Sequence, residues 1–159
     1  LTMRILIQNR QRKYPINTRQ IRQWVSDILK MQNEEDVEIG LVFVNNRTIQ
    51  RYNRDYRGKD TPTDVLSFPI RSAGATHAPP LLGDIMISLE KTYEEAPLFY
   101  RSVHEQLLFL SIHGILHLLG YDHEQSRNDA MRMKRREKVI FEAIYKTTFG
   151  KNRVPSSSP

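Results

Sequence analysis

The sequence predicts an α+β fold, a single domain over residues 3–146 with a mixed sheet of about four strands and helices packed on it. Three observations support this prediction. The chain has 159 residues, of which 39% are hydrophobic, so it is long enough for one ordinary core and short for two. Segments with strand-like alternation are mixed with segments of helical periodicity, without the strict alternation of a parallel α/β fold. A histidine cluster, from His113 to His123, begins near the end of a predicted helix.

The first part of the chain predicts two strands, each followed by a helix. Alternating β-forming residues predict strands over residues 3–8 and 37–44. Between the two strands, apolar residues recur at helical spacing and predict an amphipathic helix over 18–32. After the second strand, a second helix is predicted to run to about residue 56. The apolar stripe of the first helix consists of Ile21, Trp24, Val25, Ile28 and Leu29, and the predicted N-caps are Asn17 or Thr18 and then Asn45.

The rest of the chain alternates turn-forming segments with strands and longer helices. Glycine and proline mark the boundaries, because proline lacks a backbone N–H and glycine tolerates left-handed backbone. We expect an aperiodic loop over 71–80 and a disordered, serine-rich and proline-rich tail over 151–159. The expected elements are a turn over 57–62, strands over 63–69 and 82–89, and helices over 89–95, 102–119 and 126–145.

Composition excludes several classes of protein. The chain has no cysteine, so a transition-metal site must be built from histidines and carboxylates. No run approaches the roughly 18 apolar residues that span a bilayer, and residues 1–9 lack the features of a secretory signal. We therefore expect a cytoplasmic protein with no membrane partner. The net charge of +6 favours a polyanionic partner such as nucleic acid, although a positive charge also serves solubility alone.

The histidine cluster has the spacing of a metal site. His113 and His117 are four residues apart and lie on one helix face, so both imidazoles can reach one ion. Gly120 lets the chain leave the helix, and the following turn can return His123 to the same point. Three nitrogen ligands leave one open position on a tetrahedral zinc ion, as in catalytic sites, although nickel or cobalt would also accept three imidazoles. The other histidines have no partner at ligand spacing: His77 and His104.

The same ligand spacing, H-x-x-x-H-x-x-G-x-x-H, also occurs in metzincin proteases. In those enzymes a glutamate follows the first histidine and acts as general base for the zinc-bound water. Here that position is Gly114, which cannot accept or deliver a proton, and the spacing of Glu105 and Glu124 does not recommend either as a replacement. A protease therefore remains an alternative that the sequence disfavours.

Three segments carry a resemblance to a known family. Their sequences are HGILHLLGYDH over 113–123, YRGKDTPTDVLSFP over 56–69 and LGDIMIS over 82–88. Together they resemble the YbeY family, a group of zinc-binding endoribonucleases linked to ribosomal RNA maturation and ribosome quality control. The resemblance covers roughly residues 3 to 146.

This resemblance implies a role for individual residues. It implies that His113, His117 and His123 hold one zinc ion per chain, and that Arg57 faces the metal across a cleft that takes an RNA phosphate. The planar guanidinium suits that role because it can neutralise charge that develops on the phosphodiester. We therefore expect Arg57 and His113 to be catalytic, with ribosomal RNA and ribosomal particles as partners and no small-molecule cofactor.

Two questions of mechanism stay open in the sequence. The nucleophile is either hydroxide on the zinc or the ribose 2′-hydroxyl. The alternative to an enzyme is a non-catalytic module that binds RNA or the ribosome and in which zinc only stabilises the fold.

Other polar residues have two interpretations each. Asp64, Asp84, Ser67 and Asp122 either orient ligands or serve turns and strand ends, so we leave them outside the catalytic set. Two groups of basic residues either contact RNA or form ordinary solvated surface. They are the run from Arg132 to Lys138 and an amino-terminal group of Arg10, Arg12, Lys13 and Arg19.

Overall fold

The computed structural model describes residues 2–70, 79–122 and 124–150. In this part of the chain the strands are β1 (Met3–Asn9), β2 (Val37–Val44), β3 (Val65–Pro69) and β4 (Leu81–Ser88). The helices are α1 (Thr18–Met31), α2 (Asn46–Arg57), α3 (Leu89–Glu95), α4 (Val103–Leu118) and α5 (Arg127–Phe149), with a short 3-10 turn, η1 (Ala96–Phe99), between α3 and α4.

The described strands form one mixed sheet in the order β1-β2-β4-β3. Strands β1, β2 and β4 run parallel to one another, and β3 pairs antiparallel with β4, with Val65 opposite Ile87 and Pro69 opposite Gly83. Parallel neighbours need crossover connections, which α1 supplies between β1 and β2. The predicted α+β class and the mixed four-stranded sheet are confirmed. The order of the strands in the sheet could not be predicted, because hydrophobic periodicity does not determine which strands pair.

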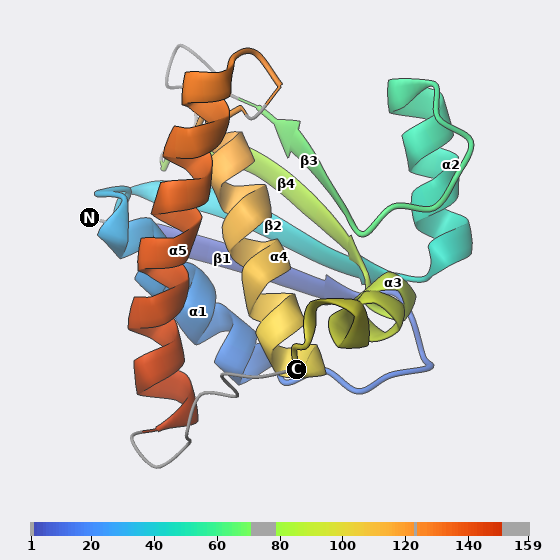
Figure 1. Ribbon diagram of the computed structural model, residues 1–159, viewed down its shortest axis with the longest axis horizontal. Helices are drawn as coiled ribbons and strands as arrows, with labels where there is room; N and C mark the ends of the chain where they lie inside the picture. The colour runs from blue at the N-terminus through green and yellow to red at the C-terminus, as the bar shows by residue number, and fades with distance from the viewer. Residues whose placement is uncertain (1, 71–78, 123, 151–159) are drawn as a thin grey trace.

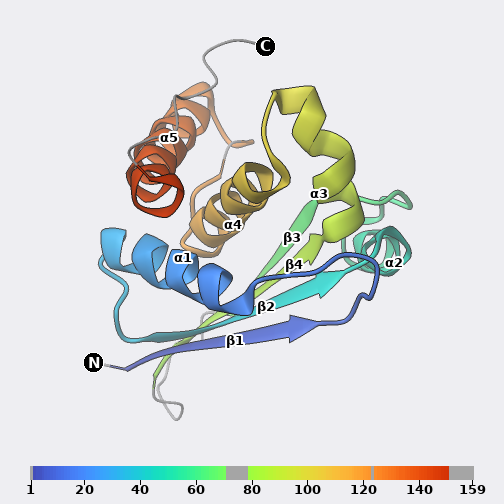
Figure 2. The same ribbon diagram turned by 90° about the horizontal axis from the view of Figure 1, so that it is seen from below.

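The two faces of the sheet differ in what covers them. Helices α1, α4 and α5 lie on one side, which we call the helix-covered face (Figures 1 and 2). On the other side, the open face, α2 packs at one end of the sheet and buries a small cluster of Val44, Ile49, Leu66 and Met86. The main core on the helix-covered face joins strand residues Ile39, Leu41, Ile85 and Ile87 to helix residues Trp24, Ile28, Leu108, Ile112 and Ile140.

Side-chain caps set the helix starts close to the predicted positions. Asn17, the first of the two predicted candidates, caps α1 by accepting a hydrogen bond from the Gln20 amide at 3.0 Å. Ser102 and Glu105 form a reciprocal capping box at the start of α4. Each side-chain oxygen there satisfies a backbone N–H that would otherwise lack a partner.

Two boundaries differ from the predicted ones, and hydrogen bonds account for both. Strand β3 starts at Val65 and not at residue 63, because the Asp64 carboxylate accepts the Val65 amide at 2.7 Å. Helix α5 continues to Phe149, four residues past its predicted end, where Thr148 accepts a hydrogen bond from the indole N–H of Trp24 at 2.9 Å. The predicted tail over 151–159 and most of the loop over 71–80 lie outside the described residues.

Within the described residues, no helix is long and apolar enough to cross a membrane.

Candidate metal centre

Helix α4 carries the first two predicted ligands and lies close against the sheet. The close approach depends on Gly114, which follows the first histidine. A Cβ atom at this position would lie 2.9 Å from Cγ2 of the buried Ile85 and 3.3 Å from Cγ2 of Val65. The carbonyl of Gly114 also accepts a hydrogen bond from the Ser67 hydroxyl of β3 at 3.0 Å. Packing therefore accounts for a glycine where a protease of similar spacing has its base.

His113 and His117 turn their Nε2 atoms toward each other. The two nitrogens are 3.1 Å apart, and the ring centroids are 4.6 Å apart with the rings nearly perpendicular. Two nitrogens that ligate one tetrahedral zinc ion at ordinary bond lengths are separated by about 3.3 Å. The pair therefore has a geometry that fits two imidazole ligands of one metal ion.

The third predicted ligand, His123, lies outside the described residues. In the part of the chain that is described, no three histidines or carboxylates form a group suited to a metal ion. The ligand role of all three histidines thus stays a prediction, which the arrangement of the first two fits.

A buried carboxylate on α5 stands behind the first histidine. Oε1 of Glu137 lies 3.3 Å from Nδ1 of His113, and Glu137 is only 9% exposed. A histidine that donates its Nδ1–H to a carboxylate keeps its Nε2 lone pair for a metal, and metal-binding histidines commonly have such a partner. Sequence analysis missed Glu137. The sequence feature that could have indicated it is a glutamate at a helical spacing from Met133, Ile140 and Ile144, the apolar residues that α5 buries.

An arginine and a phenylalanine lie near the pair of His113 and Glu137. The guanidinium carbon of Arg101 lies 4.1 Å from the ring centroid of Phe109, whose ring is in turn 5.9 Å from that of His113. Burial lowers the pKa of the Arg101 guanidinium, whereas the nearby carboxylates of Glu105 and Glu137 raise it. Arg101 also donates a hydrogen bond to Gln106 at 2.9 Å. A cation thus offsets the negative charge that Glu137 brings into a half-buried site.

Arg57, the other predicted catalytic residue, is the last residue of α2. It is exposed, and Gly58 follows it in the left-handed conformation that ends the helix. Among the described residues its side chain makes no hydrogen bond or ion pair, so the guanidinium is available to a ligand. The structure does not bring Arg57 into contact with His113 or His117. Strand β3 lies between its helix and α4 (Figure 1).

Of the four polar residues with two interpretations, three make local hydrogen bonds and one is exposed on the sheet. Asp64 accepts the backbone amide of Val65, Ser67 binds the Gly114 carbonyl, and Asp122 accepts the Glu124 amide at 2.8 Å. These three serve turns and packing, as one of their two interpretations stated. Asp84 is different, because it is exposed on the open face of the sheet.

The basic residues singled out in the sequence also differ in role, because some bind other parts of the chain and others are exposed. In the run from Arg132 to Lys138, Arg136 is a structural residue that ties α5 to α1 by donating hydrogen bonds to Gln32 and, at 2.8 Å, to the Met31 carbonyl. The other four cations of the run are exposed: Arg132, Lys134, Arg135 and Lys138.

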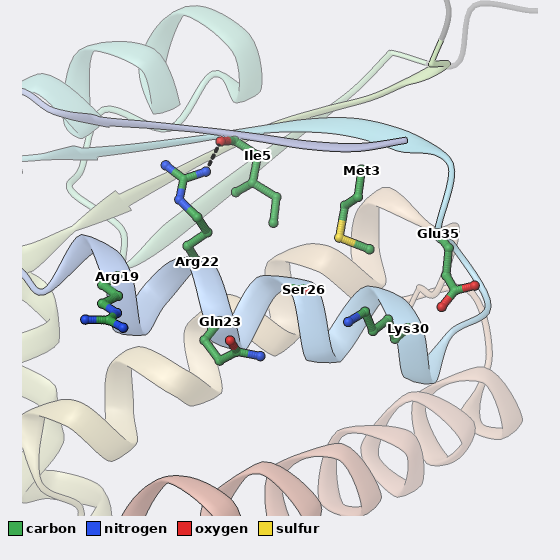
Figure 3. Close-up of a pocket in the computed structure, with 8 residues that line it drawn as sticks. All are labelled: Met3, Ile5, Arg19, Arg22, Gln23, Ser26, Lys30 and Glu35. Atoms are coloured by element: carbon green, nitrogen blue, oxygen red, sulfur yellow. Dashed lines mark hydrogen bonds between the residues drawn. The ribbon is translucent and has the colours of Figure 1, made fainter. Parts of the chain in front are cut away.

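Of the amino-terminal group, Arg19 lines a groove of about 540 Å³ between α1 and β1 together with Arg22 and Lys30 (Figure 3). Arg22 donates to the Ile5 carbonyl and so satisfies part of the outer edge of β1. This groove lies at the opposite sheet edge from β3, away from the strand against which α4 packs.

Comparisons with known proteins agree with this architecture. The family model described as "Endoribonuclease YbeY" matches residues 6–145. A protein of that name from Persephonella marina is 44% identical over 144 residues, covering 89% of this chain and 92% of the relative. Another from Geobacter sulfurreducens is 40% identical, covering 87% and 94%. The solution structure of TM1509 from Thermotoga maritima matches 98% of this chain and 99% of its own with a TM-score of 0.63, and at 24% identity it supports the fold alone.

Proposed function

The chain belongs to the YbeY endoribonuclease family, and we propose that it is a zinc-dependent endoribonuclease that cleaves single-stranded RNA. The observation that carries the zinc dependence is the facing pair of Nε2 atoms on His113 and His117, 3.1 Å apart, with Glu137 against Nδ1 of the first ring. Ribosomal RNA in ribosomal particles is the substrate that we propose from the family resemblance, in rRNA maturation and ribosome quality control in the cytoplasm.

The three histidines His113, His117 and His123 would hold the zinc ion. When bound with one open position, zinc supplies an electrophile that polarises a phosphoryl oxygen and lowers the pKa of water. The chain's own contribution is orientation. Glu137, 3.3 Å from Nδ1 of His113, would accept a proton carried on that nitrogen, which would leave the Nε2 lone pair of the ring facing His117.

Arg57 would stabilise the charge that develops on the phosphodiester. A guanidinium stays charged at every physiological pH, and it presents two parallel N–H groups to two phosphate oxygens. Its lack of a partner among the described residues supports this role, because no internal ion pair has to break before RNA binds.

One observation favours the second candidate, a non-catalytic module that binds RNA or ribosomal particles. The position of a built-in base is Gly114, and the one buried carboxylate of the described site, Glu137, faces Nδ1 of His113 and not the metal side of the ring. Cleavage assays separate the two candidates, because only an enzyme cuts RNA.

The test is cleavage of end-labelled single-stranded RNA by the zinc-loaded protein and by His113→Ala, Arg57→Ala and Arg47→Ala. Arg47 is a matched control because it is an exposed arginine on the same helix, at the other end. We expect His113→Ala to be inactive and Arg57→Ala to be slower by about 100-fold, the size of effect when one charge-stabilising donor is removed. Arg47→Ala should cleave at the wild-type rate.

Three outcomes would contradict this proposal. If Arg57→Ala cleaves as fast as the wild type, the catalytic role of Arg57 is wrong. If the wild type cuts no RNA but folded His113→Ala still sediments with ribosomal particles, the binding module is the better account. Chelator-sensitive release of peptides from unfolded casein would instead indicate a protease.

A further inference from the structure

We propose that the open face of the sheet holds a second RNA contact, a groove in which bases of a single strand stack on aromatic side chains of α2 and β3. This inference rests on the proposed function, since it names how the RNA substrate is gripped away from the metal centre. The groove has a volume of about 520 Å³, within the size range of pockets that take a ligand as large as a nucleotide. We call it the aromatic groove, and its main side chains are Tyr52, Tyr56, Phe68, Leu6, Arg10 and Asp84.

The aromatic rings of this groove are held in a fixed arrangement. Tyr52 and Tyr56 lie four residues apart on α2, with ring planes 4° from parallel and centroids 6.0 Å apart. Phe68 of β3 meets both rings edge-on, at 5.2 Å from Tyr56 and 6.3 Å from Tyr52. Tyr56 nevertheless remains 69% exposed. A ring that is oriented by its neighbours and still open to solvent is suited to stacking with a base.

The charges around the groove match a nucleic acid strand. Helix α2 carries four arginines and a single carboxylate, Asp55, which is paired with Arg54 at 3.2 Å. The guanidinium carbon of Arg51 lies 5.7 Å from the Tyr52 centroid, and Arg10 lines the groove from the β1 side. Cations beside exposed rings are the combination found where proteins bind single strands without reading long sequences.

One acidic side chain in the groove limits how a strand can lie. Asp84 is exposed on the sheet face, where its carboxylate lies against Gly40. It repels phosphates from the middle of the groove and accepts hydrogen bonds from base amino groups. The phosphates would therefore follow Arg51, which lies over Tyr52, and Arg57, which follows Tyr56, while the bases point into the groove.

The groove and the metal centre are separated by one edge strand. Along β3, Phe68 points to the aromatic groove, whereas the preceding residue, Ser67, binds the Gly114 carbonyl of α4 on the other face. This is the ordinary alternation of a strand. Arg57 directly follows Tyr56 at the end of α2. A single-stranded RNA that crosses the β3 edge of the sheet can thus contact the aromatic groove first, then Arg57, and then the side of the sheet that carries the histidines.

The experiment measures RNA affinity separately from cleavage. The zinc-loaded full chain is titrated into a short, fluorescently labelled, single-stranded 2′-O-methyl RNA, whose integrity is checked on a gel, and anisotropy gives Kd. We expect Tyr56→Leu to bind about tenfold more weakly, because one base loses its stacking partner. Tyr100→Leu is the matched control: Tyr100 is also 69% exposed but lies after η1, outside the groove, so its variant should bind like the wild type.

A second readout separates stacking from a general loss of structure. 2-Aminopurine placed in the probe loses fluorescence when it stacks, so the wild type should quench it and Tyr56→Leu should not. Both tyrosine variants should keep the wild-type melting temperature and zinc content, because each side chain is mostly exposed.

Each contrary result has its own meaning. Wild-type affinity in Tyr56→Leu, or an equal loss in Tyr100→Leu, overturns the inference; if the wild type still cleaves RNA in that case, the proposed function survives it. A groove that holds a protein segment instead of RNA would give the first of these results. A wild type that neither binds the strand nor cleaves RNA would overturn both.

Discussion

Polar and aromatic side chains differ in exposure and in pairing between the two faces of the sheet. On the helix-covered face, polar groups are partly buried and paired: His113 contacts Glu137 and His117, and Arg101 lies against Phe109 and Gln106. On the open face, Tyr56 and Asp84 are exposed, and Arg57 stands at the end of α2.

In the two proposals made above, one small sheet serves two tasks. A metal centre needs fixed ligand directions, because each ligand must reach one point in space, and buried packing supplies them. A surface that grips a flexible strand needs accessible rings and charges, and an incompletely covered sheet face supplies those. The contrast predicts that substitutions of the same kind will have unequal effects on the two faces.

The largest of these effects concerns Glu137, the carboxylate beside Nδ1 of the proposed metal ligand His113. Glu137→Gln keeps the shape of the side chain but removes the negative charge that faces Nδ1 of His113 at 3.3 Å. We expect zinc affinity, measured by competition with a chromogenic chelator, to fall by about 10-fold to 100-fold. Glu142→Gln, an exposed change on the same helix, is the control and should leave the affinity unchanged. Equal zinc affinities in the wild type and Glu137→Gln would show that this carboxylate does not position the ligand.

A smaller effect compares two glycines, one on each face. In Gly114→Ala the new methyl group would meet Cγ2 of the buried Ile85 at 2.9 Å and Cγ2 of Val65 at 3.3 Å. We expect a net loss of about 1 kcal/mol of unfolding free energy, since crowding costs about 1–3 kcal/mol and the better helix propensity of alanine returns up to about 1 kcal/mol.

In Gly40→Ala the nearest atom is Oδ1 of the exposed Asp84, which can rotate away. The unfolding free energy of this variant should stay within about 0.5 kcal/mol of the wild type, as for most surface changes. Urea denaturation of both variants measures the difference. Equal losses would show that the two faces are equally tightly packed at these positions.

Local sequence signals were sufficient for most elements. Asn17 and Asn45 cap their helices as predicted, and Ser102 lies at the predicted start of α4. The stripe from Ile21 to Leu29 is buried as its spacing predicts. The end of α5 was missed because its last turns are held by a hydrogen bond from Trp24, more than a hundred residues earlier in the chain.

The candidate site divides in the same way. The pair His113 and His117 follows from helical spacing, which is local. Glu137 is 24 residues from its partner, and only the packing of α5 on α4 brings the two together. The aromatic groove depends on the strand order, because β3 lies next to β4 and so places Phe68 beside the tyrosines of α2. No local pattern contains that information.

The most direct test of the central claim is the metal content of the untagged protein, measured by mass spectrometry for the wild type and for His117→Ala. If the histidines form a zinc site, the wild type should carry about one zinc ion per chain, and the variant should carry none while keeping its fold, because one of three nitrogen ligands is gone. Folded wild type that holds no zinc, even after zinc is supplied, would contradict the account and leave the protein without the metal chemistry that the proposed cleavage requires.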